Sequence, residues 1–253
     1  MRVFITGASS GLGESLARHY ASAQSCIGLA ARREDALQAL AAALPGRTSV
    51  HAFDIADTAS LQRAAADYMA RFGVPEIVIA NAGISVGTAG DNIADCAKLE
   101  RVLQVNVVAM AATLAAFAPA MRSAGRGTLV GISSVAGFRG LPGSGAYSAS
   151  KAAATTWLES LRIELAGSGV AVVTICPGFV DTPMTRVNRY PMPFLLSSGE
   201  AARRMARAIA ARRRIAVVPW QMAVVGTLLR ALPAWAYDRL MARAPRKSRN
   251  LPL

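Results

Sequence analysis

The chain has 253 residues, of which 53% are apolar and 17% charged, and its formal net charge is +13 at pH 7. This length and apolar content fit a single α/β domain with a large core, and they exclude a disordered chain. The three cysteines and two histidines are widely separated, with no zinc or disulfide spacing. We therefore predict reduced thiols, a cytoplasmic location and no metal site.

The positive charge is concentrated near the C-terminus. Residues 199–253 hold twelve basic and two acidic residues, a net charge of +10 that leaves +3 for the rest of the chain. Such a segment can attract nucleic acid, anionic lipid or acidic substrates. The alternative, which we favour, is a solvated surface in an arginine-rich chain. Because no nucleic-acid-binding module accompanies the basic residues, no nucleic-acid partner is predicted.

Short apolar runs alternate with helical patterns along the chain. Strands are predicted at 2–6, 26–30, 49–53, 76–80, 127–132 and 170–175. Helices are predicted at 12–23, 34–44, 58–72, 99–122 and 147–166. This alternation predicts right-handed crossovers and a Rossmann-like, doubly wound parallel sheet in one α/β domain. The first strand begins almost at the initiator methionine, so we expect no signal peptide.

A glycine-rich turn lies between the first strand and the first helix. It reads Thr6-Gly7-Ala8-Ser9-Ser10-Gly11-Leu12-Gly13, with the spacing G-x-x-x-G-x-G. Glycines let the backbone turn sharply and approach a pyrophosphate, while the helix N-terminus offers free N–H donors. Ser9 and Ser10 can add hydrogen bonds. Position after the first strand makes a dinucleotide the expected ligand.

The end of the second strand indicates which dinucleotide binds. An acidic residue here holds the adenine ribose 2′-hydroxyl in NAD-binding proteins. This chain has Ala31 in that position, followed by Arg32 and Arg33. Guanidinium groups suit a 2′-phosphate through their charge and forked donors, which favours NADP(H). The alternative is that the two arginines pair with Glu34 and Asp35.

A tyrosine and a lysine lie four residues apart in the predicted helix 147–166. Tyr147 and Lys151 therefore share one helix face, and Ser134 precedes Tyr147 by thirteen residues. A nearby ammonium favours the phenolate and lowers the pKa of a tyrosine. A tyrosine tuned in this way can exchange a proton with a carbonyl or carbinol oxygen.

These motifs, in this order, resemble the short-chain dehydrogenase/reductase family over about residues 1–185. The resemblance implies that Asp54 holds the adenine amino group and that Asn81-Ala82-Gly83 steadies the sheet beside the adenosine ribose. It also places Pro177-Gly178-x-x-x-Thr182 near the nicotinamide. The expected cofactor-binding residues are Gly7, Ser9, Ser10, Gly11, Leu12, Gly13, Arg32, Arg33, Asp54, Ile55, Asn81, Ala82, Gly83, Tyr147, Lys151, Pro177, Gly178, Val180 and Thr182.

The resemblance also implies a catalytic set of Asn106, Ser134, Tyr147 and Lys151. Ser134 would bind the substrate oxygen, and Tyr147 would donate a proton in reduction or accept one in oxidation. Lys151 would lower the pKa of Tyr147 and hold the nicotinamide ribose, while Asn106 would support a water that relays protons. The implied activity is NADP(H)-dependent reduction of a carbonyl or oxidation of a secondary alcohol, by a homodimer or homotetramer.

Residues 186–253 depart from the family pattern and are expected to form a substrate loop and a helical extension. The loop 181–198 is rich in proline and apolar residues, which favours a substrate with hydrophobic bulk; core packing is the alternative. On the other side of the pocket we expect Val135, Phe138, Leu141 and Pro142. Arginines between 203 and 214 line a predicted helix and its exit.

The segment 217–237 is almost wholly apolar, but Pro219 and Pro233 make it too short to span a bilayer. We favour a helix packed on the core or on a partner subunit. A lid over a lipophilic substrate and an interfacial segment in weak contact with an anionic membrane are the other possibilities.

The substrate and the functional class have alternatives as well. Reduction of a 3-oxoacyl thioester competes with reduction of a free lipid, steroid-like or xenobiotic ketone. A different class is a non-catalytic protein that senses a dinucleotide or serves in interactions, because a fold alone does not exclude it. The complete set of Ser134, Tyr147, Lys151 and Asn106 argues against that class, since a sensor needs none of them.

Overall fold

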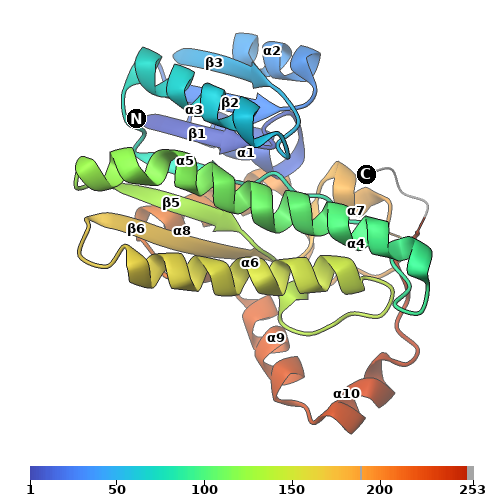
Figure 1. The fold of residues 1–253 in the computed structure, drawn as a ribbon. Helices are drawn as coiled ribbons and strands as arrows, with labels where there is room; N and C mark the ends of the chain where they lie inside the picture. The colour runs from blue at the N-terminus through green and yellow to red at the C-terminus, as the bar shows by residue number, and fades with distance from the viewer. Residues whose placement is uncertain (189, 250–253) are drawn as a thin grey trace.

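Seven parallel strands form the central sheet, in the order β3-β2-β1-β4-β5-β6-β9 (Figure 1). The structure, a computed structural model, describes residues 1–188 and 190–249. Residue 189, within the expected substrate loop, and residues 250–253, at the end of the extension, lie outside the described residues. The strands are β1 (Arg2–Thr6), β2 (Cys26–Ala31), β3 (Arg47–Ala52), β4 (Ile77–Ala80), β5 (Gly127–Ile132), β6 (Val170–Pro177) and β9 (Ile215–Val218).

This order confirms the doubly wound fold, because the chain adds strands outward from β1 in one direction and then from β4 in the other. Strand β9 was not predicted. It has four residues and follows directly on a run of arginines, so it carries too short an apolar pattern to distinguish a strand from a helix.

Helices cover both faces of the sheet. One face carries α1 (Gly11–Tyr20), α2 (Glu34–Ala43) and α8 (Ser198–Ala210), and the other carries α3 (Thr58–Phe72), α4 (Cys96–Leu103), α5 (Ala109–Ser123) and α6 (Gly145–Glu164). Neighbouring residues of one strand serve opposite cores: Phe4 belongs to the second and Ile5 to the first. Strands buried on both faces read as continuous apolar runs, which explains why the sequence predicted them well.

The predicted helix 99–122 is part of a longer helical run. A 3₁₀ turn (η1, Ile93–Asp95) leads into α4, and a π-helical segment (η2, Gln104–Val108) joins α4 to α5. By length and composition Ile93–Ser123 could cross a membrane. Here it packs against β4, β5, α3 and α6, so its apolar face supplies the protein core.

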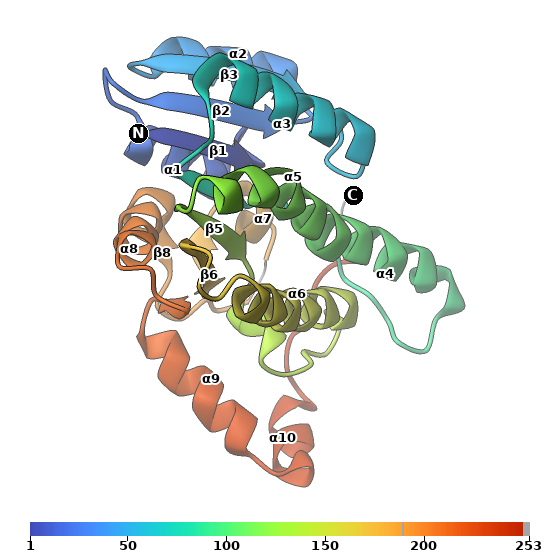
Figure 2. The ribbon, with the colours of Figure 1, turned by 60° about the vertical axis from the view of Figure 1, so that its left-hand side comes forward.

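The C-terminal extension is helical, as predicted, and after α8 and β9 it contains two further helices. Both α9 (Gln221–Ala231) and α10 (Ala234–Met241) project away from the layered core in two views (Figures 1 and 2). Pro233 precedes α10 and ends the helical run, since proline lacks the N–H that continues a helix. We call residues 220–241 the arm.

Beyond the arm, the chain returns to the loop that follows β4. The Gly87 N–H donates to Ser248 O at 2.9 Å, and Lys247 Nζ donates to Ser85 Oγ at 2.9 Å. Arg249 Nε donates to the buried carboxylate of Asp95 at 2.8 Å. We call residues 244–249 the strap, because these contacts fasten the chain end over that loop.

Candidate active site

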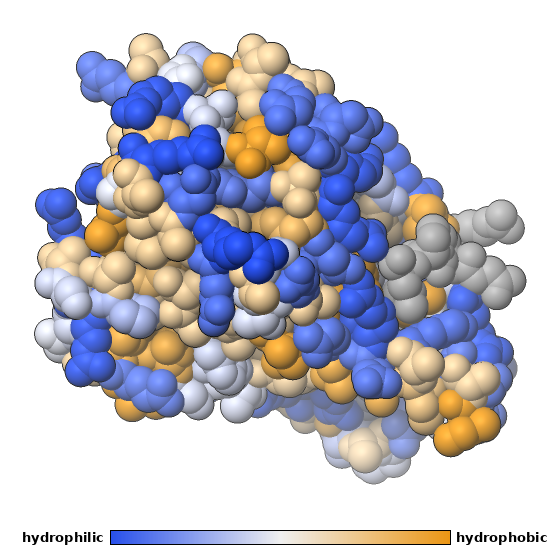
Figure 3. Space-filling view, turned by 45° about the horizontal axis from the view of Figure 1, so that its top comes forward, coloured by the Kyte–Doolittle hydropathy of each residue, from blue (hydrophilic) through white to orange (hydrophobic). Residues whose placement is uncertain are grey.

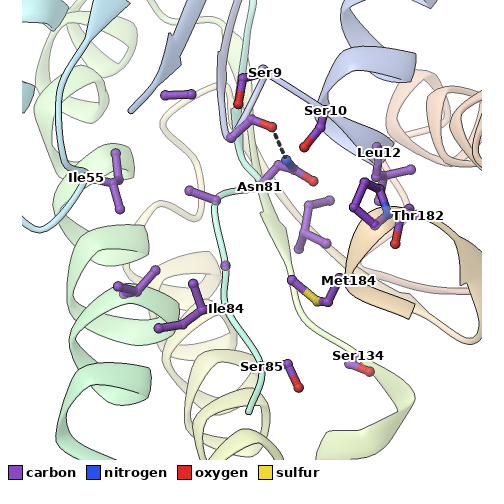
Figure 4. Close-up of a pocket in the computed structure, with 18 of the residues that line it drawn as sticks. Ser9, Ser10, Leu12, Ile55, Asn81, Ile84, Ser85, Ser134, Thr182 and Met184 are labelled. Carbon is purple, nitrogen blue, oxygen red and sulfur yellow. Dashed lines mark hydrogen bonds between the residues drawn. The ribbon is translucent and has the colours of Figure 1, made fainter. Parts of the chain in front are cut away.

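A cleft of about 650 Å³ opens at the carboxyl ends of β1, β4, β5 and β6. Because strand order reverses between β1 and β4, this is the edge where doubly wound sheets bind ligands. Ser9 and Ser10 lie at one end of the cleft, and Ser85 and Ser134 lie at the other (Figure 4). The cleft therefore joins the glycine turn to the predicted catalytic residues.

The glycine turn has the geometry that an anionic ligand requires. Gly7 and Gly11 have φ values of +68° and +58°, which side chains rarely tolerate. The N-cap of α1, Ser10, makes no side-chain capping bond, so the first N–H groups of α1 stay available for an anion. This cradle fits the pyrophosphate of a dinucleotide. Gly13 does not line the cleft; a Cβ there would collide with Gly7 O, so its role is close packing.

Asn81 fixes the glycine turn to the end of β4. Its Nδ2 donates to Thr6 O at 3.0 Å and to Gly7 O at 3.3 Å, and the bond to Gly7 is the dashed line in Figure 4. In return, Thr6 Oγ1 accepts from the N–H groups of Asn81 and Ala82, both at 3.1 Å. Asn81, Ala82 and Gly83 all line the cleft. The Asn81-Ala82-Gly83 motif thus fixes the distance between the ends of β1 and β4, which border the cleft.

The two predicted arginines line the same end of the cleft. Arg33 Nη2 donates to Ser9 O at 2.9 Å and to Ser9 Oγ at 3.2 Å, which ties it to the glycine turn. Among the ion pairs of residues 1–188 and 190–249, none joins Arg32 or Arg33 to Glu34 or Asp35. Both arginines are exposed beside Ala31 and line the cleft, and Arg32 lies close enough to Asp54 to help lower the pKa of that carboxyl.

Asp54 lies after β3 and pairs with an arginine from α4. Arg101 Nη2 donates to Asp54 Oδ2 at 2.6 Å, and the Ala56 N–H donates to Oδ1 at 3.0 Å. Burial alone would raise the pKa of Asp54, but these two donors outweigh it and hold the pKa below its usual value. Ile55 and Arg101 also line the cleft. Arg101 was not predicted, since one arginine in a helix gives no sequence signal.

At the other end, Ser134, Tyr147 and Lys151 converge. Ser134 Oγ accepts from the Ala136 N–H at 3.1 Å and donates to Pro177 O at 3.4 Å, and it lies close enough to the Tyr147 hydroxyl to lower the pKa of that phenol. Lys151 is buried, and its Nζ donates to Ile132 O at 2.7 Å and lies 5.8 Å from the centre of the Tyr147 ring. The end of β5 and one face of α6 therefore bring the three side chains together.

The pKa values differ from the sequence expectation. Burial raises the pKa of Tyr147, and its hydrogen bond with Ser134 opposes that effect only in part. Burial also lowers the pKa of Lys151 to about 8. The direction for Tyr147 is opposite to the predicted effect of Lys151. The lysine amine is directed to the Ile132 carbonyl, so burial dominates at the phenol.

Asn106 lies in the π-helical segment and does not line the cleft. Its Oδ1 accepts from the Ile84 N–H at 2.8 Å, and its Nδ2 donates to Ile84 O and Ser150 Oγ, both at 3.0 Å. Ser150 Oγ donates in turn to Tyr147 O at 2.7 Å. Asn106 thus connects the loop after β4 with the helix that carries Tyr147. The periodic pattern of the helix gave no indication of the π-helical segment.

The loop after β6 closes the cleft over the glycine turn. Pro177, Gly178, Val180 and Thr182 line it, and a Cβ on Gly11 would lie 3.2 Å from the Thr182 side chain. Thr182 lies in the loop that joins β7 (Val180–Asp181) to the short helix α7 (Pro183–Arg186). Lining residues that the sequence reasoning missed include Ile84, Ser85, Arg101 and Val105, whereas Met184, Thr185 and Val187 belong to the predicted substrate loop 181–198. Ile84 and Ser85 follow β4 in an irregular segment, which has no periodic pattern.

The predicted opposite wall of the pocket was wrong. The cleft is not lined by Val135, Phe138, Leu141 or Pro142. Phe138 packs instead on the arm, where a Cβ on Gly226 would collide with its ring. Leu141 and Pro142 line a second, more open pocket with Tyr237 of α10. Phe138, Leu141 and Pro142 therefore lie beside the arm, whose position the sequence analysis did not predict.

Comparison with known proteins agrees with this geometry. Residues 1–192 match the short chain dehydrogenase family model. An uncharacterized oxidoreductase of Myxococcus xanthus is 40% identical over 94% of this chain and 95% of its own. A short-chain dehydrogenase structure from Streptomyces avermitilis has a TM-score of 0.80 at 26% identity, covering 95% of this chain and 94% of its own.

Two further structures carry cofactors. An alcohol dehydrogenase from Thermococcus sibiricus, complexed with 5-hydroxy-NADP, has a TM-score of 0.76 at 25% identity and covers 86% of this chain and 95% of its own. A 3-oxoacyl-[acyl-carrier protein] reductase from Brucella melitensis with bound NAD has a TM-score of 0.74 at 27% identity and covers 86% and 88%. The chain belongs to the short-chain dehydrogenase/reductase family of nicotinamide-dependent oxidoreductases, which act on CH–OH and C=O groups.

Proposed function

We propose that this protein reduces the carbonyl group of a substrate with hydrophobic bulk, using NADPH. The observation that carries the proposal is the contact between Tyr147 and Ser134, beside Lys151, at one end of a cleft whose other end is the glycine turn. The dinucleotide supplies the hydride when bound, and the protein supplies position and electrostatics.

Tyr147 and Ser134 act on the substrate oxygen in this proposal. The raised pKa of Tyr147 keeps the phenol protonated at neutral pH, so it can donate its proton to a carbonyl oxygen. Ser134 Oγ, which already contacts the Tyr147 hydroxyl, stabilises the charge that develops on the same oxygen. In the reverse reaction the phenolate would accept the proton of the alcohol, so the same two side chains serve oxidation as well.

Lys151 and Asn106 support Tyr147 in distinct ways. Lys151 lines the cleft and would hold the nicotinamide ribose, while Asn106 lies behind the wall and contacts Ile84 and Ser150. A Cβ on Gly83 would lie 3.2 Å from Asn106 Oδ1 and 3.6 Å from Lys151 Nζ. The missing side chain leaves a path between these two groups, which supports a proton relay through them.

The choice of NADP(H) rests on the arginines. The relative with 5-hydroxy-NADP and the relative with NAD have the same fold, so family membership leaves the choice open. Arg33, held by Ser9, and exposed Arg32 supply charge and forked donors beside Ala31, where a carboxylate for a 2′-hydroxyl is missing.

Apolar side chains support a hydrophobic substrate. Ile84, Val105, Met184 and Val187 line the cleft, and Met184 and Val187 are also exposed to solvent. A 3-oxoacyl thioester remains the second candidate, because the structural relative from Brucella melitensis reduces 3-oxoacyl groups on acyl carrier protein. The same lining suits a free lipid, steroid-like or xenobiotic ketone.

The test is NADPH and NADH oxidation with a panel of free ketones and 3-oxoacyl thioesters. We expect turnover with NADPH and bulky apolar carbonyls. NADPH binding without turnover of any carbonyl would instead identify a dinucleotide sensor. Light scattering on the same preparation tests the proposed homodimer or homotetramer, and fractionation of the source cells tests the proposed cytoplasmic location.

A further inference from the structure

Large apolar side chains are exposed on the arm. Of the fifteen large apolar residues found exposed among residues 1–188 and 190–249, five lie on the arm. They are Trp220, Val224, Leu228, Trp235 and Leu240. Trp220 is 67% exposed and Trp235 is 74% exposed, which is unusual for the largest apolar side chain. On the face seen in Figure 3, by contrast, apolar residues are interspersed with hydrophilic ones.

The arm has an inner and an outer face. Trp220, Val224 and Leu228 recur every four residues and therefore form a stripe along one side of α9. Met222 and Gly226, on the opposite side, are buried against Gly178 and Phe138. The exposed stripe is thus the side that the core leaves uncovered.

Contacts on the inner face hold the arm in this orientation. Arg139 Nη1 donates to Leu229 O at 3.1 Å and Leu232 O at 3.0 Å, and its guanidinium lies 4.1 Å from the centre of the Tyr237 ring. The Tyr237 hydroxyl donates to Gly140 O at 2.7 Å. These bonds pair the last carbonyl groups of α9 and the hydroxyl of the buried Tyr237. They hold the arm so that its apolar stripe faces solvent.

The charge around the stripe selects an anionic occupant. Residues 220–249 hold six basic residues and one acidic residue, Asp238, a net charge of +5. Among the described ion pairs, the arginines at 230, 239, 243 and 246 have no carboxylate partner. A second copy of the same arm would bring like charges together. An anionic surface that also accepts apolar side chains would match both the unpaired positive charge and the exposed apolar stripe.

We propose that the arm docks this protein on an anionic lipid membrane. Tryptophan suits the boundary between headgroups and hydrocarbon, and arginine suits anionic headgroups. The eleven residues of α9 reach about 17 Å, well short of a bilayer core of about 30 Å, so the arm lies in the interface. A helix with an apolar stripe and basic flanks has the features of an interfacial anchor.

Docking would bring the cleft to the membrane. A Cβ on Gly178, which lines the cleft, would lie 2.7 Å from Met222 Cγ on the inner face of α9. The arm and the cleft therefore share one wall. A hydrophobic substrate could then reach the cleft from the bilayer, a consequence that rests on the proposed function, whereas docking itself does not.

The experiment measures co-sedimentation of the full chain with vesicles of phosphatidylcholine alone or with phosphatidylglycerol. We expect binding to the anionic vesicles that weakens as salt rises. The triple variant Trp220→Ser, Leu228→Ser, Trp235→Ser should lose at least tenfold in partitioning. The double variant Ile93→Ser, Ile163→Ser is the control, since these side chains are 86% and 63% exposed elsewhere and should leave partitioning unchanged.

Three results would overturn the proposal. One is no binding of the wild type to anionic vesicles; another is equal partitioning of the triple variant and the control. The third is a lower oligomeric state of the triple variant in light scattering, which would assign the stripe to a contact between copies. Circular dichroism and NADPH binding establish that each variant is folded. If the wild type binds the vesicles but turns over no carbonyl substrate, the proposed function is refuted and the docking proposal stands.

Discussion

Arg101 Nη2 lies 2.6 Å from Asp54 Oδ2 at the adenosine end of the cleft. The pair joins α4 to the loop after β3, two elements that the sequence did not connect. Both side chains are partly exposed, so the ion pair adds little to stability, about 0–1 kcal/mol. Its consequence is positional, because it orients a carboxylate whose pKa is held low by the Ala56 N–H and by Arg101 itself.

The variant Asp54→Asn should weaken NADPH binding with little loss of stability. The amide loses charge-assisted acceptance of an amino group, so we expect about a tenfold higher Kd. Asp57→Ala is the control: Asp57 caps α3 by accepting from the Ser60 N–H at 3.0 Å, so this variant should lose about 1 kcal/mol of stability. Fluorescence titration and urea unfolding separate the two effects. An unchanged Kd in Asp54→Asn would remove Asp54 from the cofactor site.

Replacement of Arg33 should change the cofactor preference. Arg33→Gln keeps a donor but loses the charge and the forked geometry that a 2′-phosphate uses. We expect the ratio of kcat/KM for NADPH over NADH to fall about tenfold or more. Arg63→Gln on α3, which does not line the cleft, should leave the ratio unchanged. The same ratio in both variants would mean that Arg33 only supports the glycine turn through Ser9.

The elements that were predicted correctly share one property: residues close together in the sequence are enough to identify them. Phe4 and Ile5 mark a strand buried on both faces, and the glycine turn marks the ligand that it can approach. Residues that act through contacts distant in sequence were missed. Arg101 meets Asp54 only because the fold brings α4 to the loop after β3, and no pattern within α4 indicates that partner.

Two other features depend on competition between local and tertiary effects. The π-helical segment at Asn106 departs from helical periodicity and allows its amide to meet both Ile84 and Ser150. The pKa of Tyr147 depends on burial and on the direction of the Lys151 amine, neither of which follows from the four-residue spacing. The four-residue spacing predicts that Tyr147 and Lys151 share a helix face, whereas burial and the contacts of the two side chains determine the pKa of Tyr147.

Removal of one hydroxyl should abolish turnover. Tyr147→Phe loses the proton donor, and general acid catalysis contributes about 10²–10⁴ in rate, so kcat should fall by that factor. NADPH binding should persist, because Lys151 and the glycine turn remain. Tyr20→Phe removes a buried hydroxyl that has no hydrogen-bond partner among the described residues, and it should leave kcat unchanged. Residual turnover of Tyr147→Phe above one-tenth of the wild type would contradict the assigned role.

Stability of the protein without ligands should rise from about pH 8 and pass through a maximum near pH 10. Burial lowers the pKa of Lys151 and of Lys247 to about 8. The unfolded state therefore binds more protons between about pH 8 and 10, and stability rises with pH by on the order of 1 kcal/mol per unit for each such group. Above pH 10 the trend reverses, because burial raises the pKa of Tyr20, Tyr68 and Tyr147 and the folded state then retains more protons.

Urea unfolding at several pH values measures this profile, and Lys151→Met provides the comparison. We expect the variant to be more stable than the wild type at pH 7 and to show a shallower rise between pH 8 and pH 10. Lys98→Met, which removes a half-buried partner of Asp95, should keep the slope of the wild type. A wild-type slope in Lys151→Met would mean that the lysine is charged in the folded state up to its ordinary pKa.

The strap should control the loop that carries Ser85. A Cβ on Gly87 would collide with Lys247 O, so Gly87→Ala must displace the strap and break the bond from Lys247 to Ser85. Because Ser85 lines the cleft, we expect a higher KM for the carbonyl substrate, an unchanged Kd for NADPH and faster hydrogen exchange in residues 85–95. Gly90→Ala is the matched control, since a Cβ there meets no atom within 4 Å. Equal exchange and equal KM in the two variants would show that the strap lies on the loop without restraining it.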